Sequence, residues 1–162
     1  MSYIRIKTIS NQKYAYQVEI VSTPKGPRQK VKQYLGKIYS LESIQELDTI
    51  ILGTKKQDLL QNLILAQLKS LGFQEKDNFL TFQDLIFSPE DFTFIKKTKT
   101  NKKQAAVLSL NQGYLSTFTL QRIINFKKSK NLNQDAQNLA KYFLEAGLPI
   151  SKELFVKYYQ SL

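Results

Sequence analysis

The sequence contains no cysteine and no histidine. Without cysteine there is no disulfide, no thiolate nucleophile and no thiolate metal ligand. Without histidine, the usual zinc sites and imidazole general bases are excluded as well. The six glycines form no phosphate-binding cluster, and no Walker lysine motif occurs. We therefore predict that the protein is not an enzyme and that it holds no cofactor and no metal.

Long apolar runs are also missing. No window of the sequence approaches twenty apolar residues, which is the length that spans a bilayer as a helix. The first ten residues alternate apolar and basic side chains, unlike the uninterrupted apolar core of a signal peptide. We predict a cytoplasmic protein with no membrane partner.

Acidic residues are scarce where basic residues are abundant. The chain of 162 residues has 24 basic and 13 acidic residues, a formal net charge of +11. Residues 1–40 hold eight basic residues and one acidic residue, whereas residues 41–95 hold four basic and nine acidic ones. Residues 96–103, KKTKTNKK, add five lysines. Basic charge gathered in one segment and one loop indicates a polyanionic partner, which we predict to be nucleic acid, either DNA or RNA.

The first forty residues predict three β-strands. Apolar and polar side chains alternate over residues 3–9, 13–21 and 28–36, and these segments are rich in Tyr, Val and Ile. The connectors, SNQ and TPKGP, are short and carry turn residues. Short connectors make neighbouring strands antiparallel, so we predict a β-meander.

The alternation also predicts what the faces of this sheet carry. Ile4 and Ile6 share one side of the first strand, and Val31 and Leu35 share one side of the third. We predict that the other face of the sheet contacts nucleic acid through basic and tyrosine side chains: Tyr3, Arg5, Lys7, Lys13, Arg28, Lys30, Lys32 and Tyr34. Lys96, Lys97, Lys99, Lys102 and Lys103 would extend the same surface. The alternative is a solvated surface, because exposed strands often carry lysine to prevent edge pairing.

The remainder of the chain is predicted to be mainly helical. Helical patterns cover residues 41–51, 54–73, 114–127, 134–146 and 152–161, with Thr54 and Ser151 as candidate caps. The Phe-rich residues 78–95 predict short strands or buried loops. We therefore predict an α+β fold in which a three-stranded antiparallel β-meander (1–40) packs on a mainly helical remainder (41–162). That remainder would contain the short Phe-rich β/loop segment and a C-terminal helical bundle.

Three other interpretations depend on particular residues. Asp84, Glu90 and Asp91 are the only tight acidic group outside clear helices, and they would be needed for Mg²⁺ catalysis; we expect them to cap turns instead. The segment around Arg122 could form a helix-turn-helix, but its apolar residues favour a packing helix. The aromatic residues of the last helices indicate core or an oligomer contact: Tyr142, Phe143, Phe155, Tyr158 and Tyr159. A homo-oligomeric assembly or adaptor protein is therefore the alternative function.

Residues 3–37 contain two motifs that are found together elsewhere. The first is Tyr14, Tyr16, Val18 and Glu19, and the second is Lys25, Arg28, Gln29, Tyr34, Leu35 and Gly36. This segment resembles the N-terminal part of prokaryotic, especially archaeal, insertion-sequence transposases and of short archaeal proteins that share it. The spacing from lysine to arginine is one residue longer here, with Pro27 before Arg28. The resemblance implies a module that contacts nucleic acid, without the three-carboxylate catalytic domain, for which this chain is too short.

Overall fold

The protein is described by a computed structural model that covers residues 2–44, 53 and 55–162. The strands are β1 (Ser2–Ile9), β2 (Gln12–Thr23), β3 (Gly26–Ser40), β4 (Gln74–Lys76), β5 (Phe79–Phe82), β6 (Leu85–Ser88), β7 (Thr93–Lys97), β8 (Lys103–Leu110) and β9 (Gly113–Leu115). The helices are α1 (Lys56–Ser70), α2 (Thr117–Ile124), α3 (Leu132–Glu145) and α4 (Lys152–Gln160).

The described strands form one mixed sheet of nine strands. Its order is β1-β2-β3-β8-β7-β6-β5-β4, and β9 pairs with β8 beside this path. The junction between β3 and β8 is parallel and runs from Lys37 opposite Ala106 to Ser40 opposite Ser109. Of the described residues, 41% lie in strands and 30% in helices. The predicted meander on a mainly helical remainder is therefore wrong, because residues 74–115 add six strands to the same sheet.

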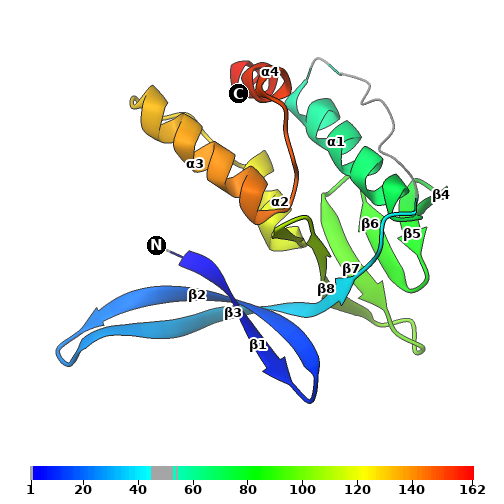
Figure 1. Cartoon of the computed structure of the whole chain (residues 1–162), viewed down its shortest axis with the longest axis horizontal. Helices are drawn as coiled ribbons and strands as arrows, with labels where there is room; N and C mark the ends of the chain where they lie inside the picture. Colours follow the sequence, from blue (N-terminus) through cyan, green and yellow to red (C-terminus); the bar gives the residue numbers. More distant parts are fainter. Residues whose placement is uncertain (1, 45–52, 54) are drawn as a thin grey trace.

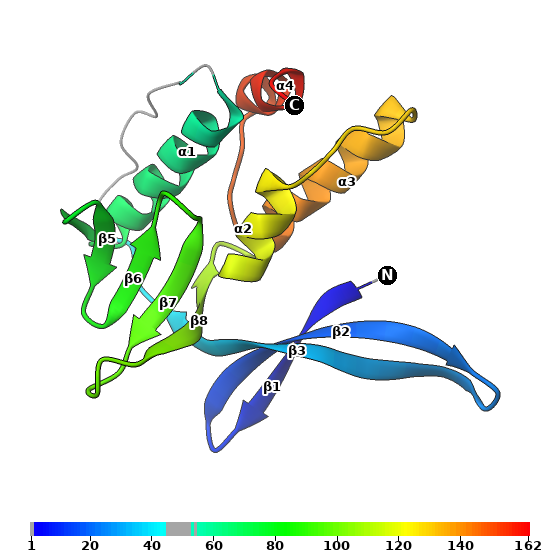
Figure 2. The same ribbon diagram turned by 180° about the vertical axis from the view of Figure 1, so that it is seen from behind.

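The three N-terminal strands were predicted correctly, although β2 and β3 are longer than expected. Ser10 and Asn11 have φ of 48° and 61°, a left-handed pair that suits a tight two-residue hairpin turn. The distal half of the β2–β3 hairpin, residues 19–30, forms an arm that projects away from the helices (Figures 1 and 2). We call these residues the hairpin arm.

Two hydrophobic cores lie on opposite faces of the sheet. The larger core joins β5–β8 to all four helices and includes Phe87, Phe94 and Leu108. The smaller core joins β1–β3 to β9 and α2, and its fully buried members include Ala15 and Val107. Strand β8 therefore contributes alternate side chains to both cores. As a result, the smaller core covers one face of β1–β3, and the larger core covers the opposite face of β4–β7. Tyr39, at the end of β3, also packs against the larger core.

The helices confirm part of the prediction. Ser116 caps α2 in a reciprocal capping box with Thr119, and Ser151 caps α4 by accepting a hydrogen bond from the Leu154 N–H. The predicted helix over 114–127 begins later than expected, because residues 113–115 pair with β8. The predicted helix over 41–51 lies mostly outside the described residues, and so does its neighbour Thr54.

Gly36 allows β3 to approach β8 closely. A Cβ atom at this position would lie 2.5 Å from the backbone oxygen of Ala105, and its φ is +133°. The close approach and the positive φ both favour glycine, which has no Cβ atom. This residue lies where the β-meander joins the rest of the sheet.

Candidate functional site

The register between β1 and β2 separates the predicted basic residues. Arg5 is the cross-strand partner of Tyr16, and Lys7 is the partner of Tyr14. Lys13 is opposite Thr8 and lies on the other face, together with Ile4 and Ile6. Directly opposite residues share a face of an antiparallel pair. Arg5 and Lys7 therefore share a face with tyrosines, and Lys13 does not.

The register between β2 and β3 separates them further. Tyr34 is opposite Tyr16, whereas Lys30 is opposite Glu19 and Arg28 is opposite Val21. The pairing shifts twice, between Ala15 and Tyr16 and between Gln17 and Val18. Each shift leaves one residue of β3 unpaired, as in a β-bulge. The prediction that all these basic residues share one face of the sheet is wrong, because it assumed uninterrupted alternation and the wrong pairing of faces.

A row of lysine and tyrosine side chains runs along the face of β1–β3 that the smaller core leaves uncovered, and it ends at Lys96 of β7. Its members are Lys7, Tyr14, Tyr16, Tyr34, Lys37, Tyr39 and Lys96, and we call it the tyrosine–lysine strip. Tyr34 contacts Tyr16 and Tyr14, with ring centroids 5.4 and 6.4 Å away. Three tyrosine rings from two strands therefore form one cluster.

Lysines lie over rings at both ends of this cluster. The Lys7 Nζ atom is 5.0 Å from the centroid of the Tyr16 ring. Lys37 and Lys96 place their Nζ atoms 5.6 and 5.1 Å from the Tyr39 centroid. Such cation–π contacts hold an ammonium group at the surface without an acidic partner. Within the described residues, Lys7, Lys37 and Lys96 form no ion pair with a carboxylate.

Tyr34 is the exposed centre of the strip, with 46% of its surface accessible. Partial burial raises the pKa of its phenol, and the neighbouring Tyr16, Tyr14 and Tyr39 raise it further. The hydroxyl is therefore neutral at pH 7 and can act as a hydrogen-bond donor.

Acidic charge lies on the other face of the hairpin. Lys32 forms an ion pair with Glu19, with 3.0 Å between Nζ and Oε2. Lys30 is the cross-strand partner of the same carboxylate. The residues of β1–β3 that share the face of Tyr14 and Tyr16 include no acidic side chain, so the two faces differ in how much of their basic charge is uncompensated.

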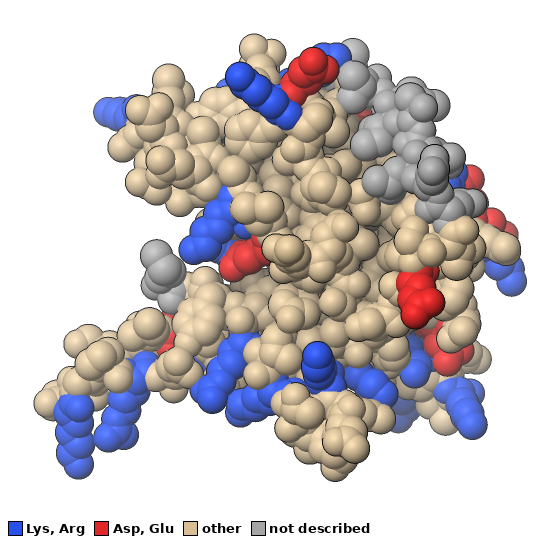
Figure 3. Space-filling view, viewed as in Figure 1, with Lys and Arg blue, Asp and Glu red and all other residues tan. Residues whose placement is uncertain are grey.

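Figure 3 shows how these faces combine on the molecular surface. Lys and Arg side chains follow the lower edge of the molecule, from the hairpin arm on the left towards β7 and β8 on the right. Strand twist is right-handed and is increased by bulges, so a long ribbon turns its faces along its length. Twist therefore allows basic residues that the register places on different faces to reach the same edge.

The predicted lysine loop is a structured turn. Lys96 and Lys97 belong to β7 and Lys103 to β8, while the Thr98 N–H donates to the Lys102 carbonyl at 2.9 Å. Lys99 and Lys102 are exposed on this turn. Lys96 is the one of these five lysines that joins the strip through Tyr39.

Sequence reasoning missed four members of the strip. Tyr14 and Tyr16 are not among the residues predicted for the basic face, and Lys37 and Tyr39 lie beyond the predicted end of the third strand. The two-residue turn after Ile9 fixes the β1–β2 register and could have placed the first two. The contact between Tyr39 and the β7 lysine depends on long-range pairing and leaves no local signal.

Arg122 and two of the aromatic residues of the last helices make packing contacts within the protein. Arg122 forms an ion pair with Glu145 and stacks 4.0 Å from the centroid of Tyr142, so it supports α3. Phe143 and Tyr158 are buried in the larger core.

Asp91, one of the three residues of the acidic group, stabilises a turn. Asp91 accepts a hydrogen bond from the Thr93 hydroxyl at 2.8 Å. The hydrogen bond from Ser88, followed by those from Thr93, lowers the pKa of the Asp91 carboxyl. Within residues 2–44, 53 and 55–162, no group of three potential metal ligands is present.

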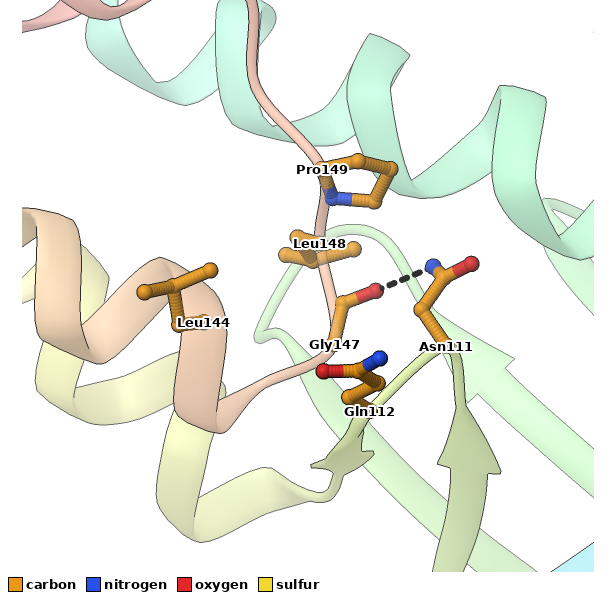
Figure 4. Close-up of a pocket in the computed structure, with 6 residues that line it drawn as sticks. All are labelled: Asn111, Gln112, Leu144, Gly147, Leu148 and Pro149. Atoms are coloured by element: carbon orange, nitrogen blue, oxygen red, sulfur yellow. Dashed lines mark hydrogen bonds between the residues drawn. The ribbon is translucent and has the colours of Figure 1, made fainter.

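A small hollow lies between the β8–β9 turn and the end of α3 (Figure 4). Its lining includes Asn111, Leu144 and Pro149, and the Asn111 amide donates to the Gly147 carbonyl at 2.7 Å. None of the lining residues is titratable, so this hollow offers neither a charge nor a nucleophile.

Comparisons with protein-family models, with curated proteins and with solved structures each found no match. In the part of the chain that the structure describes, no helix has the length and apolar character needed to cross a membrane.

Proposed function

We propose that the protein binds nucleic acid, DNA or RNA, mainly through the phosphate backbone and without catalysing a reaction. The observation that carries this proposal is the tyrosine–lysine strip, an acid-free row of cations and tyrosine rings on an uncovered sheet face. Lysines that neutralise phosphates release condensed counterions, and this release supplies the affinity. Tyrosine rings between them can pack on sugars or stack on bases.

The footprint in this proposal extends beyond the strip. Arg5 lies on the same face and donates a hydrogen bond to Gln29, which holds its guanidinium above the β2–β3 ribbon. Tyr3 shares this face as the partner of Val18. Exposed basic residues outside the strip would contact flanking phosphates: Lys13 of β2, Arg28 and Lys30 of the hairpin arm, Lys32 of β3, and Lys99 and Lys102 of the β7–β8 turn.

The resemblance of residues 3–37 to the transposase segment agrees with this proposal, and a shared role for that segment is part of it. The alternative of an assembly protein has less support, because Phe143 and Tyr158, two of its five aromatic residues, are buried in the larger core.

A fluorescence-anisotropy titration tests the proposal. Labelled duplex DNA, single-stranded DNA and RNA of equal length are titrated with the protein at several salt concentrations. We expect binding with a linear fall of log affinity against log salt concentration. Absence of binding to all three at low salt would refute the proposal.

A further inference from the structure

The face of β4–β8 opposite the helices contains a hollow with a volume of about 540 Å³. Its lining includes the apolar side chains of Phe79, Ile86 and Ile95, and these residues belong to three adjacent strands. The helices pack on the opposite face of these strands, so the hollow opens to solvent.

Three lysines surround these apolar side chains. Lys97 and Lys103 are direct cross-strand partners, and Lys76 is the partner of Phe79. Like charges directly opposite each other in a ladder are destabilising. Lys97 and Lys103 form no ion pair within the described residues, so an anion between them would offset their repulsion.

Charge alone does not define this site. Asp77 and Asp84 also line the hollow, and against three lysines they leave a net charge of +1. A simple anion would be held weakly by this balance. Phe79, however, exposes 42% of its surface beside the lysines, which adds an aromatic surface for a flat ring. A ligand that combines an anion with a planar ring matches both features.

We propose that this hollow binds a segment of single-stranded nucleic acid, with one base stacked on Phe79 and a phosphate farther along the strand between Lys97 and Lys103. Open sheet faces with exposed aromatic residues are suited to unpaired bases, because bases in a duplex are already stacked. The site lies on the other face of the sheet from the tyrosine–lysine strip. It shares only its class of partner with the function proposed above.

The absence of tryptophan from the chain permits a direct test. The variant Phe79→Trp places the only tryptophan in the hollow, and the matched control Leu144→Trp places it on α3, where Leu144 is 71% exposed. Each variant is titrated with labelled decathymidylate while tryptophan fluorescence and anisotropy are recorded together. An abasic decamer and decaglutamate serve as probes with charge but without bases.

We expect decathymidylate to quench the tryptophan of Phe79→Trp and to leave that of Leu144→Trp unchanged. Adding Lys97→Gln and Lys103→Gln should raise the half-saturating concentration by about tenfold at 0.15 M salt, because two contacts to a single strand are lost. Anisotropy change without quenching would overturn the inference and leave the proposed function standing. Equal quenching by the abasic decamer or by decaglutamate would overturn it as well.

The strip variant Lys7→Gln with Lys37→Gln separates the two proposals. The two strip substitutions are combined with Phe79→Trp. If decathymidylate still quenches the tryptophan and the overall affinity is unchanged, the strip is refuted as a binding surface and the hollow is supported. Loss of overall affinity with quenching absent in Phe79→Trp would support the strip and refute the hollow.

Discussion

Replacing Lys7 and Lys37 together by glutamine removes two charges from the tyrosine–lysine strip. The two ammonium groups lie over the rings of Tyr16 and Tyr39, at 5.0 and 5.6 Å. Glutamine keeps much of the side-chain length and its polarity but cannot neutralise a phosphate. The change therefore tests the charge of the strip while leaving its tyrosine rings in place.

The expected effect follows from counterion release. Each contact to a duplex phosphate contributes about 0.9 to the slope of log affinity against log salt concentration, so the double variant should lose about 1.8. With a 1 M reference, this loss corresponds to an affinity that is about 60-fold lower at 0.1 M salt and about fivefold lower at 0.4 M salt. The difference between the proteins should therefore shrink as salt is added.

The matched control is Lys127→Gln with Lys130→Gln. Both lysines lie in the connection between α2 and α3, and the double change lowers the net charge equally. Anisotropy with labelled duplex DNA is measured for all three proteins between 0.05 and 0.4 M salt, and urea unfolding checks that each variant is folded. If the strip variant and the control variant lose affinity equally, only net charge matters and the reasoning about the strip is refuted.

Three further predictions address the neighbouring structure. Glu19→Gln should free Lys32 from its ion pair and steepen the salt slope by up to about 0.9; an unchanged slope in the anisotropy assay would exclude Lys32 from the footprint. Gly36→Ala should lower the free energy of unfolding, measured with urea, by about 3 kcal/mol, because an added Cβ would meet backbone atoms within 3 Å. Gly26→Ala should lower it by about 1 kcal/mol, because a Cβ there would meet open space. Equal losses in the two variants would contradict this reasoning. Burial raises the pKa of the Tyr158 phenol in the folded protein, which means that the folded state favours the neutral phenol. This contribution to stability is present below the unfolded pKa of about 10 and is lost as pH rises above it. Tyr158→Phe should lower the free energy of unfolding at pH 7 by about 1 kcal/mol, because the hydrogen bond to the Ile123 carbonyl is lost. Above pH 10, urea titrations should show a smaller loss of stability for this variant than for the parent protein.

The sequence was sufficient for the elements that are long and regular. Alternation over seven to nine residues marks β1, β2 and β3, and a wide apolar stripe marks α1. Strands β4, β5 and β6 have only three or four residues each, which is too short for a period of two to be distinguished from a buried loop. The parallel pairing of β3 with β8 joins distant segments and has no local pattern. The fold class was therefore wrong although many of its elements were right.

In the candidate site, too, local signals could be read from the sequence and other features could not. The turn at Ser10 and Asn11 is a local signal, and counting back from it places Arg5 opposite Tyr16. The first register shift in the β2–β3 hairpin adjoins Gly36, but the second, between Gln17 and Val18, has no glycine or proline beside it. Without those shifts, Tyr34 cannot be assigned to the face of Tyr16, and the composition of the strip stays hidden.

The parallel junction of β3 and β8 has a consequence for the order of folding. The β1–β3 hairpins and the β4–β7 hairpins join neighbours in sequence, so each can close short loops quickly. The junction joins Lys37 to Ala106, and closing so long a loop costs more entropy before any contact compensates for it. Because β8 supplies Ala106 and Leu108 to one core and Val107 to the other, neither core is complete until this strand is in place. We therefore predict that the pairing of β3 with β8 is a late step of folding, because it is the step that brings both cores together.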